Sequence, residues 1–500
     1  MQQPQPGILH NQPLPPLKPQ QVYIVKILLI QQDMGIREVE FPMLPIGLTY
    51  IASALSDHDV KIFDPNCYPL SSAFEELEKE VSRFQPDIAG ISIRNIDTTN
   101  FRNKHIHFQT VLPTIQTVKA VNQDIKIIVG GSGFSLFPEK IMETIPEIDF
   151  GVYLEGEAST PELIRHLDDP VNVRGIYMRK NGNVFYTGDR DLPEFFSIPA
   201  PRMDPDVIDM GKYIGPSYNI IGIQTKRGCS LDCGYCSYPK LNGKRIRPRD
   251  PVAIVDQIEQ MINDFGMKRF VFVDSVFNVP EQHAWNILNE MIARKLNVEF
   301  GAWCHMKGVT EEFLQLLKRA GAVQVDFSPD AATNKGLKAL KKGIEVSDIL
   351  STVKAARKVK GMGYGFGFFA DLPGYNILDV IKTWIMPFRI QFMLPGRGGG
   401  AISYIRIEPE THIQKVAIQE GLIDAEDHLW PSDETELKEL FYRQPSNARM
   451  NFLTDTIIAL MERVLKPSVV KTMRTVSRLM GKQSVYDQKT GFAAFQKVKK

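Results

Sequence analysis

Hydrophobic and polar positions follow two alternating rhythms in the first part of the chain. Short apolar runs of strand type alternate with stretches in which apolar residues recur at helical spacing. The predicted strands cover 22–30, 60–63, 88–93, 125–129 and 150–154, and the predicted helices cover 45–55, 74–84, 108–121, 138–144 and 161–167. Strict β–α alternation predicts a doubly wound, Rossmann-like parallel sheet that binds its ligand at the carboxyl ends of the strands.

A second alternating region begins at residue 219. Its predicted strands are 220–224, 269–273, 298–302, 323–327, 364–369 and 403–406, and its predicted helices are 251–265, 281–294, 311–320, 346–358 and 412–420. Six strand–helix units suit a partial (βα)6 TIM-type barrel better than a full eight, and barrel chemistry lies at the carboxyl ends of the strands. The glycine-rich run 395–400 is expected to be a flexible loop before the last strand.

The remaining segments complete the domain organisation. An Asn181-Gly182 turn predicts a β-hairpin within a proline-stiffened linker. We expect a disordered Gln/Pro-rich tail at 1–21, a first domain at 22–170, the linker at 171–218, a second domain at 219–425 and a helical region at 426–500. Two amphipathic helices are expected in the last region, at 450–465 and 468–480. The second is either a cap over the barrel or, if the substrate is a lipid, a helix on a membrane surface.

Composition narrows the possible partners. Lys and Arg number 59 and Asp and Glu 58, a net charge of +1, so no overall field indicates nucleic acid. We expect a small-molecule, lipid or peptide substrate. The start of the chain lacks the features of a signal peptide, and no apolar run approaches the roughly 20 residues that span a bilayer, so we expect a cytoplasmic protein without a transmembrane segment.

Three of the five cysteines, Cys229, Cys233 and Cys236, fall within eight residues. Three thiolates this close can bind three corners of an iron–sulfur cube, which leaves the fourth iron open for chemistry. Structural zinc is the alternative, with Cys304 or His305 as a distant fourth ligand. A cluster-bearing electron-transfer or binding protein without turnover is another.

The CxxxCxΦC spacing, the aromatic Tyr235 before the last cysteine and the preceding apolar strand resemble the radical S-adenosylmethionine (SAM) enzymes. The resemblance implies a [4Fe–4S] cluster on the three cysteines, SAM on the open iron and Tyr235 beside the adenine. It also implies SAM contacts by Asp274 and Ser328, although Asp274 begins a run that replaces the family's usual glycine-rich motif. Capping of the following helices is the alternative for these polar residues.

The first domain resembles the cobalamin-binding domain that precedes the radical SAM domain in one large subfamily. The resemblance rests on glycine-containing turns after the predicted strands and implies that they contact cobalamin; the residues are Gly47, Gly130, Gly131, Glu155, Gly156 and Glu157. The Asp-x-His-x-x-Gly motif is missing, so we expect no histidine ligand to cobalt. Arg94 is expected near the lower face of the corrin, unless it pairs with Asp97.

Together the two resemblances imply a cobalamin-dependent radical SAM methyltransferase. Such an enzyme moves a methyl group from SAM, through methylcobalamin, to an unactivated carbon, and takes electrons from a donor such as flavodoxin or ferredoxin. A cyclase or other oxidoreductase without methyl transfer is the alternative. His305 and Asp326 at the barrel strand ends are candidates for an acid or base, but the catalytic residues stay unknown.

Overall fold

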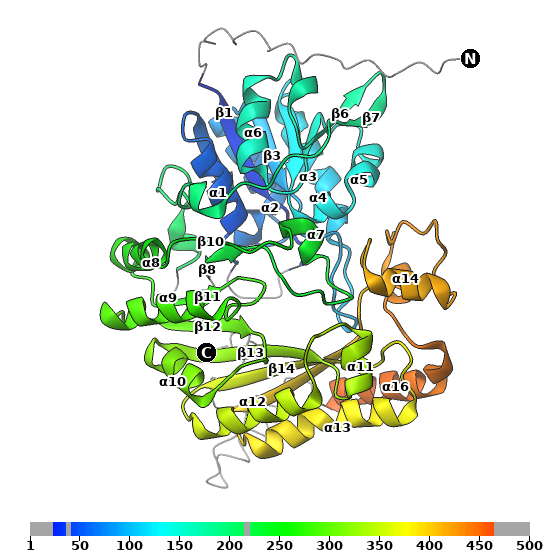
Figure 1. Cartoon of the computed structure of the whole chain (residues 1–500). Helices are drawn as coiled ribbons and strands as arrows, with labels where there is room; N and C mark the ends of the chain where they lie inside the picture. The colour runs from blue at the N-terminus through cyan, green and yellow to red at the C-terminus, as the bar shows by residue number, and fades with distance from the viewer. Residues whose placement is uncertain (1–23, 37–41, 215–220, 465–500) are drawn as a thin grey trace, which may run out of the picture.

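The computed structural model describes residues 24–36, 42–214 and 221–464. It consists of two α/β domains stacked end to end, with a helical C-terminal region beside the second (Figure 1). The expected tail at 1–21 and the expected helix at 468–480 lie outside the described residues. No described helix is both long and apolar enough to cross a bilayer.

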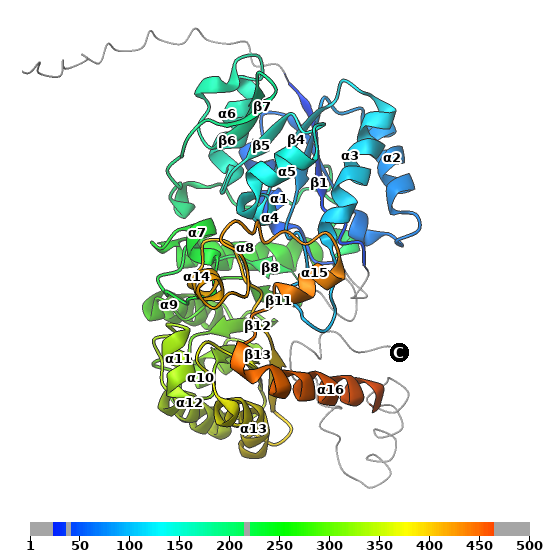
Figure 2. The ribbon, with the colours of Figure 1, turned by 90° about the vertical axis from the view of Figure 1, so that its right-hand side faces the viewer.

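The first domain contains a seven-stranded sheet in the order β2-β1-β3-β4-β5-β6-β7. Its first five strands are parallel, as predicted, and β6 and β7 are antiparallel. The strands are β1 Lys26–Gln31, β2 Asp59–Phe63, β3 Ile88–Ser92, β4 Lys126–Gly130, β5 Phe150–Val152, β6 Ile176–Lys180 and β7 Asn183–Tyr186. The main helices are α1 Ile46–Ala54, α2 Ala73–Phe84, α3 Val111–Val121, α4 Ser132–Leu136, α5 Pro138–Thr144 and α6 Gly156–Arg165. Helices cover both faces, with α2 against α3 and α1 against α6 (Figure 2).

The segment predicted as a linker is more integrated than expected. The hairpin forms, with Asn181 and Gly182 both at positive φ as its turn requires, but it extends the sheet because β6 pairs with β5. Residues after the hairpin also contact the first domain. The Ile62 amide donates to the Val207 carbonyl, and the buried Tyr213 hydroxyl donates to Asp64 Oδ2. The apolar side chains of this segment therefore belong to the first domain's core.

The second domain is the predicted six-stranded, all-parallel partial barrel, in the order β15-β14-β13-β12-β11-β8. Its strands are β8 Gly222–Ile223, β11 Arg269–Phe272, β12 Glu299–Cys304, β13 Ala322–Asp330, β14 Gly363–Phe369 and β15 Gly398–Ser403. Its outer helices are α8 Pro251–Phe265, α9 Glu281–Ala293, α10 Glu311–Arg319, α12 Val346–Lys358 and α13 Ile377–Met393. The short elements are β9 Lys226–Arg227, α7 Tyr238–Asn242, β10 Arg247–Pro248 and α11 Asn334–Ala339, and beyond the barrel lie α14 His412–Gln419, α15 Glu434–Glu439 and α16 Ala448–Val464.

The prediction for the last barrel strand was wrong. The glycine run expected as a flexible loop supplies the first half of β15, and the strand ends at Ser403, where it was expected to begin. The cause is close packing against α13, a helix the periodicity did not reveal. A Cβ on Gly398 would lie 2.8 Å from Leu394, and a Cβ on Gly400 would lie 2.4 Å from Pro387.

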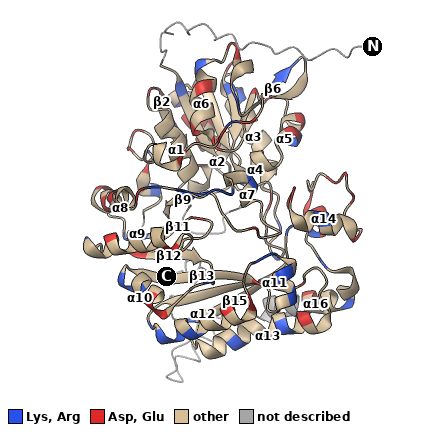
Figure 3. Ribbon diagram, viewed as in Figure 1, with Lys and Arg blue, Asp and Glu red and all other residues tan. Residues whose placement is uncertain are grey.

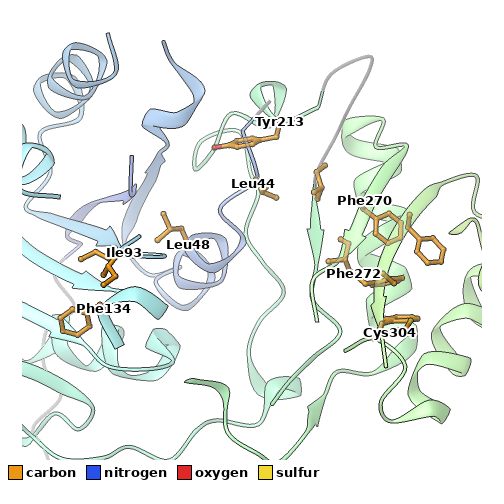
Figure 4. Packing of buried hydrophobic residues seen from close by; sticks show 14 of the residues in the cluster. Leu44, Leu48, Ile93, Phe134, Tyr213, Phe270, Phe272 and Cys304 are labelled. Carbon is orange, nitrogen blue, oxygen red and sulfur yellow. The ribbon is translucent and has the colours of Figure 1, made fainter. Parts of the chain in front are cut away.

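One continuous cluster of buried apolar side chains includes both domain cores (Figure 4). It contains Leu48 and Phe134 of the first domain together with Phe270 and Phe272 of the second. The loop after β3 adds a second contact, since Phe101 packs edge-on against Tyr404 and Phe441. The two domains therefore share apolar packing.

Asp371, at the end of β14, attaches the C-terminal helical region to the barrel. The fully buried carboxylate accepts hydrogen bonds from the Gln444 amide at 2.8 Å and from the side chains of Asn447 and Asn451 at 2.9 and 2.7 Å. The Asp371 side chain therefore anchors the start of α16.

We expect Asp371→Ala to lower the free energy of unfolding by about 3 kcal/mol, because it leaves several buried N–H donors without an acceptor. Urea denaturation measures the change, and limited proteolysis should show early cleavage near α16. The exposed Asp264→Ala is the matched control, and equal stability of the two variants would contradict the anchoring role.

Candidate two-cofactor site between the domains

The three clustered cysteines lie on the loop between β9 and α7, at the junction of the two domains (Figure 1). The loop is fixed by its backbone. The Cys229 amide donates to the Gly243 carbonyl at 3.1 Å, and the Gly234 amide donates to the Leu340 carbonyl at 2.8 Å. Gly228 has a φ of +85°, and a Cβ there would lie 2.0 Å from the Arg245 carbonyl oxygen, so only glycine fits before Cys229.

The donor set fits an iron–sulfur cluster better than a single ion. Cys229, Cys233 and Cys236 are unpaired thiols, each partly exposed. Burial raises the pKa of the Cys236 thiol to about 12, so its thiolate form needs a cation beside it. Among the described residues, no three His, Cys, Asp or Glu side chains surround a position for one metal ion. Zinc needs such a position, whereas each cysteine of a cluster binds a different iron.

Tyr235 is locked between the cysteine loop and the strand ends of the barrel. Its hydroxyl donates to Asp330 Oδ2 at 2.6 Å, and Lys342 Nζ lies 2.6 Å from the same oxygen. The Tyr235 ring also packs edge-on against Phe369, the last residue of β14, at 5.1 Å. The sequence did not indicate the Asp330–Lys342 pair, which fixes the ring at the barrel mouth. The predicted contact of Tyr235 with adenine stays a prediction.

Asp274 holds the base of the cysteine loop. Its Oδ1 accepts from the Thr225 amide at 2.8 Å, and its Oδ2 accepts from the Thr225 hydroxyl at 2.5 Å and from Lys226 Nζ at 2.8 Å. Both carboxylate oxygens therefore accept hydrogen bonds from Thr225 and Lys226, which precede Cys229 by four and three residues. The expected SAM contact of Asp274 stays a prediction. Ser328 is exposed at the end of β13, in a position open to a ligand, and its SAM contact is likewise a prediction.

Glu155 and Glu157, expected at cobalamin, form the main ionic contact between the domains. Arg227 donates to Glu155 at 3.0 Å and to Glu157 at 2.6 Å, and Arg247 donates to Glu155 at 2.9 Å. These acidic and arginine side chains are at most 7% exposed. Burial lowers the pKa of the Arg227 guanidinium, but Glu157 and Glu155 outweigh it and hold that pKa above its usual value. Figure 3 shows the basic segment around β9 crossing between the domains.

Aromatic rings complete this contact. The Arg227 guanidinium lies 4.5 Å from the centroid of Phe195 and 5.2 Å from that of Tyr50. Arg249 donates to the Tyr50 hydroxyl at 3.2 Å. We use the term interdomain clamp for Glu155, Glu157, Arg227 and Arg247. Because Arg227 is two residues before Cys229, the clamp ties the cysteine loop directly to the first domain.

The glycines expected at cobalamin have different surroundings. Gly47 is exposed, and a Cβ there would meet nothing within 4 Å. A Cβ on Gly130 would make only ordinary contacts, the nearest at 3.5 Å. Gly131 has a φ of +96°, and a Cβ there would lie 2.6 Å from the Ile93 carbonyl, so the fold requires glycine here, and its cobalamin contact stays a prediction. Gly156 packs the start of α6 on Ile51 of α1.

The alternative for Arg94, an ion pair with Asp97, does not form. Asp97 accepts from Arg406 at 2.8 Å in a buried ion pair that joins the two domains. The Arg94 side chain is exposed, while its carbonyl accepts from the Ser132 hydroxyl of α4 at 2.7 Å. Helix α4 contacts α7, the helix after Cys236, so Arg94 lies on the side of the first domain that faces the cysteine loop. The open space at Gly47 and the exposed Arg94 fit a flat ligand at this edge.

Asp326 and His305 are the two candidates for acid or base. Asp326 Oδ1 accepts from Gln324 Nε2 at 2.7 Å, while Asp326 Oδ2 and His305 Nε2 are buried without a hydrogen-bond partner. Burial raises the pKa of Asp326 to about 6. Burial also lowers the pKa of His305, whose Nδ1 accepts from the Lys307 amide at 3.3 Å.

Comparisons with known proteins agree with this geometry. The B12 binding domain family matches residues 33–164, and the Radical SAM superfamily matches residues 223–383. The chain belongs to the radical SAM enzymes that carry a cobalamin-binding domain, and the expected cofactors are thereby confirmed: a [4Fe–4S] cluster, SAM and cobalamin.

Two relatives and one solved structure illustrate the similarity. An uncharacterised methyltransferase of Pyrococcus horikoshii is 28% identical over 63% of this chain and 66% of its own length. The anaerobic magnesium-protoporphyrin IX monomethyl ester cyclase of Rubrivivax gelatinosus is 27% identical over 58% of this chain and 52% of its own length. The fold is that of the radical SAM methyltransferase TsrM from Kitasatospora setae, with a TM-score of 0.73, 20% identity and 89% of each chain covered.

We expect Glu155→Gln to destabilise the protein by about 3 to 5 kcal/mol, because it leaves buried arginine charge without a counter-ion. Denaturant unfolding measures the loss, and iron content after reconstitution measures its effect on the cysteine loop. Glu194→Gln, which breaks an ion pair with the exposed Arg245, should leave the stability almost unchanged, because solvent screens the pair. Similar losses in both variants would argue against the interdomain clamp.

The raised pKa of Asp326 predicts a pH dependence of stability. A folded-state pKa above the unfolded value of 3.8 means that the folded protein binds the proton more tightly. The free energy of unfolding should therefore fall as the pH rises from about 4 to about 6, by up to about 3 kcal/mol. This decline should be absent in Asp326→Asn, and parallel pH profiles of the two proteins would contradict the assignment.

Proposed function

We propose that this radical SAM enzyme is a C-methyltransferase, which places a methyl group on an unactivated carbon of a small-molecule, lipid or peptide substrate. The observation that carries the proposal is the interdomain clamp, which fastens the cysteine loop to the turn after β5 of the cobalamin-binding domain. The two cofactor sites are then held facing each other, as a reaction that uses both requires. The name of the Pyrococcus relative, a methyltransferase, supports the same activity.

The protein's own residues supply position and shielding. Cys229, Cys233 and Cys236 would hold the cluster, and the turns at Gly47 and Gly130 with Arg94 would hold cobalamin. When bound, these groups supply reductive cleavage of SAM and a carrier for the methyl group. The buried pairs around Tyr235 and Asp274 keep the loop rigid, so substrate and cofactors meet in one fixed geometry.

The second candidate function is cyclisation or another rearrangement without methyl transfer. The relative from Rubrivivax is named a cyclase, and its identity to this chain is close to that of the methyltransferase. The chain matches 66% of the length of the Pyrococcus relative and 52% of the length of the Rubrivivax relative. Neither relative's activity can therefore be assigned to this chain from the match alone.

Anaerobic incubation with SAM bearing a deuterated methyl group separates these functions. The reduced protein, loaded with cluster and cobalamin, is mixed with a metabolite and peptide extract of the cells that produce it. Methyl transfer predicts S-adenosylhomocysteine, 5′-deoxyadenosine and a product that carries the labelled methyl group. Mass spectrometry detects all three, and Cys233→Ala should abolish them.

The other outcomes assign the alternatives. Deoxyadenosine without S-adenosylhomocysteine indicates a rearrangement, and absence of both products indicates a non-catalytic iron–sulfur protein. Omission of cobalamin should stop methyl transfer without preventing cluster assembly.

A further inference from the structure

The interior face of β13 carries two polar side chains where a packed barrel would carry apolar ones. Side chains alternate along a strand, so Gln324 and Asp326 share one face and Val325 and Phe327 the other. Phe327 stacks on Phe366 in the apolar core beneath the helices. The Asp326 carboxylate instead lies across Gly365 of β14, where a Cβ would come within 2.0 Å of its Oδ1.

Each of these side chains has one polar atom without a partner. Gln324 is 1% exposed and Asp326 is 9% exposed. Their mutual hydrogen bond, from Gln324 Nε2 to Asp326 Oδ1, leaves Gln324 Oε1 and Asp326 Oδ2 buried and unbonded. Both atoms are acceptors when the carboxyl is ionised, so the missing group is a hydrogen-bond donor. Buried polar atoms of this kind are rare in native proteins and require an explanation.

The buried lysines of this domain that the structure describes are paired with other carboxylates. Lys226 is paired with Asp274, and Lys342 is paired with Asp330. In the part of the chain that the structure describes, no ion pair to Asp326 is formed. A buried carboxylate without a counter-ion is costly, so this position favours a ligand with positive charge.

Space for a ligand adjoins the pair. A Cβ on Gly399 of β15 would meet nothing within 4 Å, and one on Gly367 of β14 would find its nearest neighbour, the Ser328 hydroxyl, at 3.7 Å. Packing does not require glycine at either position. Ser328 is exposed at the mouth, two residues beyond Asp326. The wall beside the polar pair therefore contains three glycines, Gly365, Gly367 and Gly399, with Gly365 and Gly399 in register with Asp326.

We propose that Gln324 and Asp326 bind a nitrogen cation of the substrate, so that the substrate is a protonated amine or a guanidine held inside the barrel. The two free acceptors take its N–H donors, the carboxylate balances its charge, and the glycine wall accommodates the group attached to the nitrogen. This inference deepens the proposed function, because it assumes that the substrate enters the barrel below the cofactors.

Ligand-observed NMR on the protein loaded with cluster and cobalamin tests this with matched probes. Phenethylammonium is compared with 2-phenylethanol, and butylguanidinium with butylurea. We expect each cation to bind at least tenfold more tightly than its neutral partner. Asp326→Asn should remove this preference, whereas the exposed Glu312→Gln should keep it. Equal binding of both members, binding of neither, or an unchanged preference in Asp326→Asn overturns the proposal.

A second variant tests the proposal independently, in case Asp326→Asn does not fold. Gly399→Val adds bulk where a Cβ meets no neighbour, so it should fold normally and weaken phenethylammonium at least tenfold. Cluster absorbance and thermal unfolding verify both variants. Unchanged binding in a folded Gly399→Val protein contradicts the placement of the ligand against β15. The binding test needs no SAM, so its failure is distinct from failure of methyl transfer, which is read from S-adenosylhomocysteine.

Discussion

The buried ion pairs between Arg227, Arg247, Glu155 and Glu157 are the constraint on which the rest of the site depends. Bringing four charges out of water is costly, and the cost is offset only when each charge has close partners of opposite sign. Here the partners come from different domains, so the charges are balanced only while the domains are joined. Because Arg227 directly precedes the cysteine loop, the position of that loop is a property of the assembled pair of domains.

Other contacts between the domains, both aromatic and ionic, reinforce this constraint. Phe195 and Tyr50 face the Arg227 guanidinium, and the Asp97–Arg406 pair adds a second buried ionic contact on the loop after β3. Since the apolar cluster also runs through both cores, unfolding of one domain exposes apolar surface and unpaired charge in the other. Ionic pairs and shared core thus favour a single cooperative unit.

Much of the fold could be read from periodicity, and the failures have physical causes. Strands such as 88–93 and 125–129 are mainly apolar and largely buried, so their signal is clear. Helix α13 escaped because its apolar residues do not lie on one face: Phe388 and Phe392 are 64% and 88% exposed, and Pro387 interrupts the pattern. Gly398 and Gly400 were interpreted as part of a loop. In the structure they are strand residues that pack closely against this helix and the residue that follows it.

Some residues of the site could be predicted from the sequence and others could not. The three cysteines are close in sequence, so spacing alone identified them. Glu155 was expected at cobalamin, and that contact stays a prediction. Its ion pairs with Arg227 and Arg247 were not predicted, because a sequence does not show which arginine in another domain neutralises a carboxylate. Asp326 appeared only as a polar residue at a strand end, and its unbonded oxygen beside Gln324 depends on the packing of the whole barrel.

The interdomain clamp also limits how this enzyme could be rebuilt from parts. A chimera that joins the first domain of one relative to the barrel of another would inherit carboxylates from one parent and arginines from the other. Unless both parents place these charges at matching positions, the hybrid would bury unpaired ions beside its cysteine loop. Exchange of domains within such a family therefore requires paired substitutions, and the acidic turn after β5 should change together with the basic segment around the cysteines.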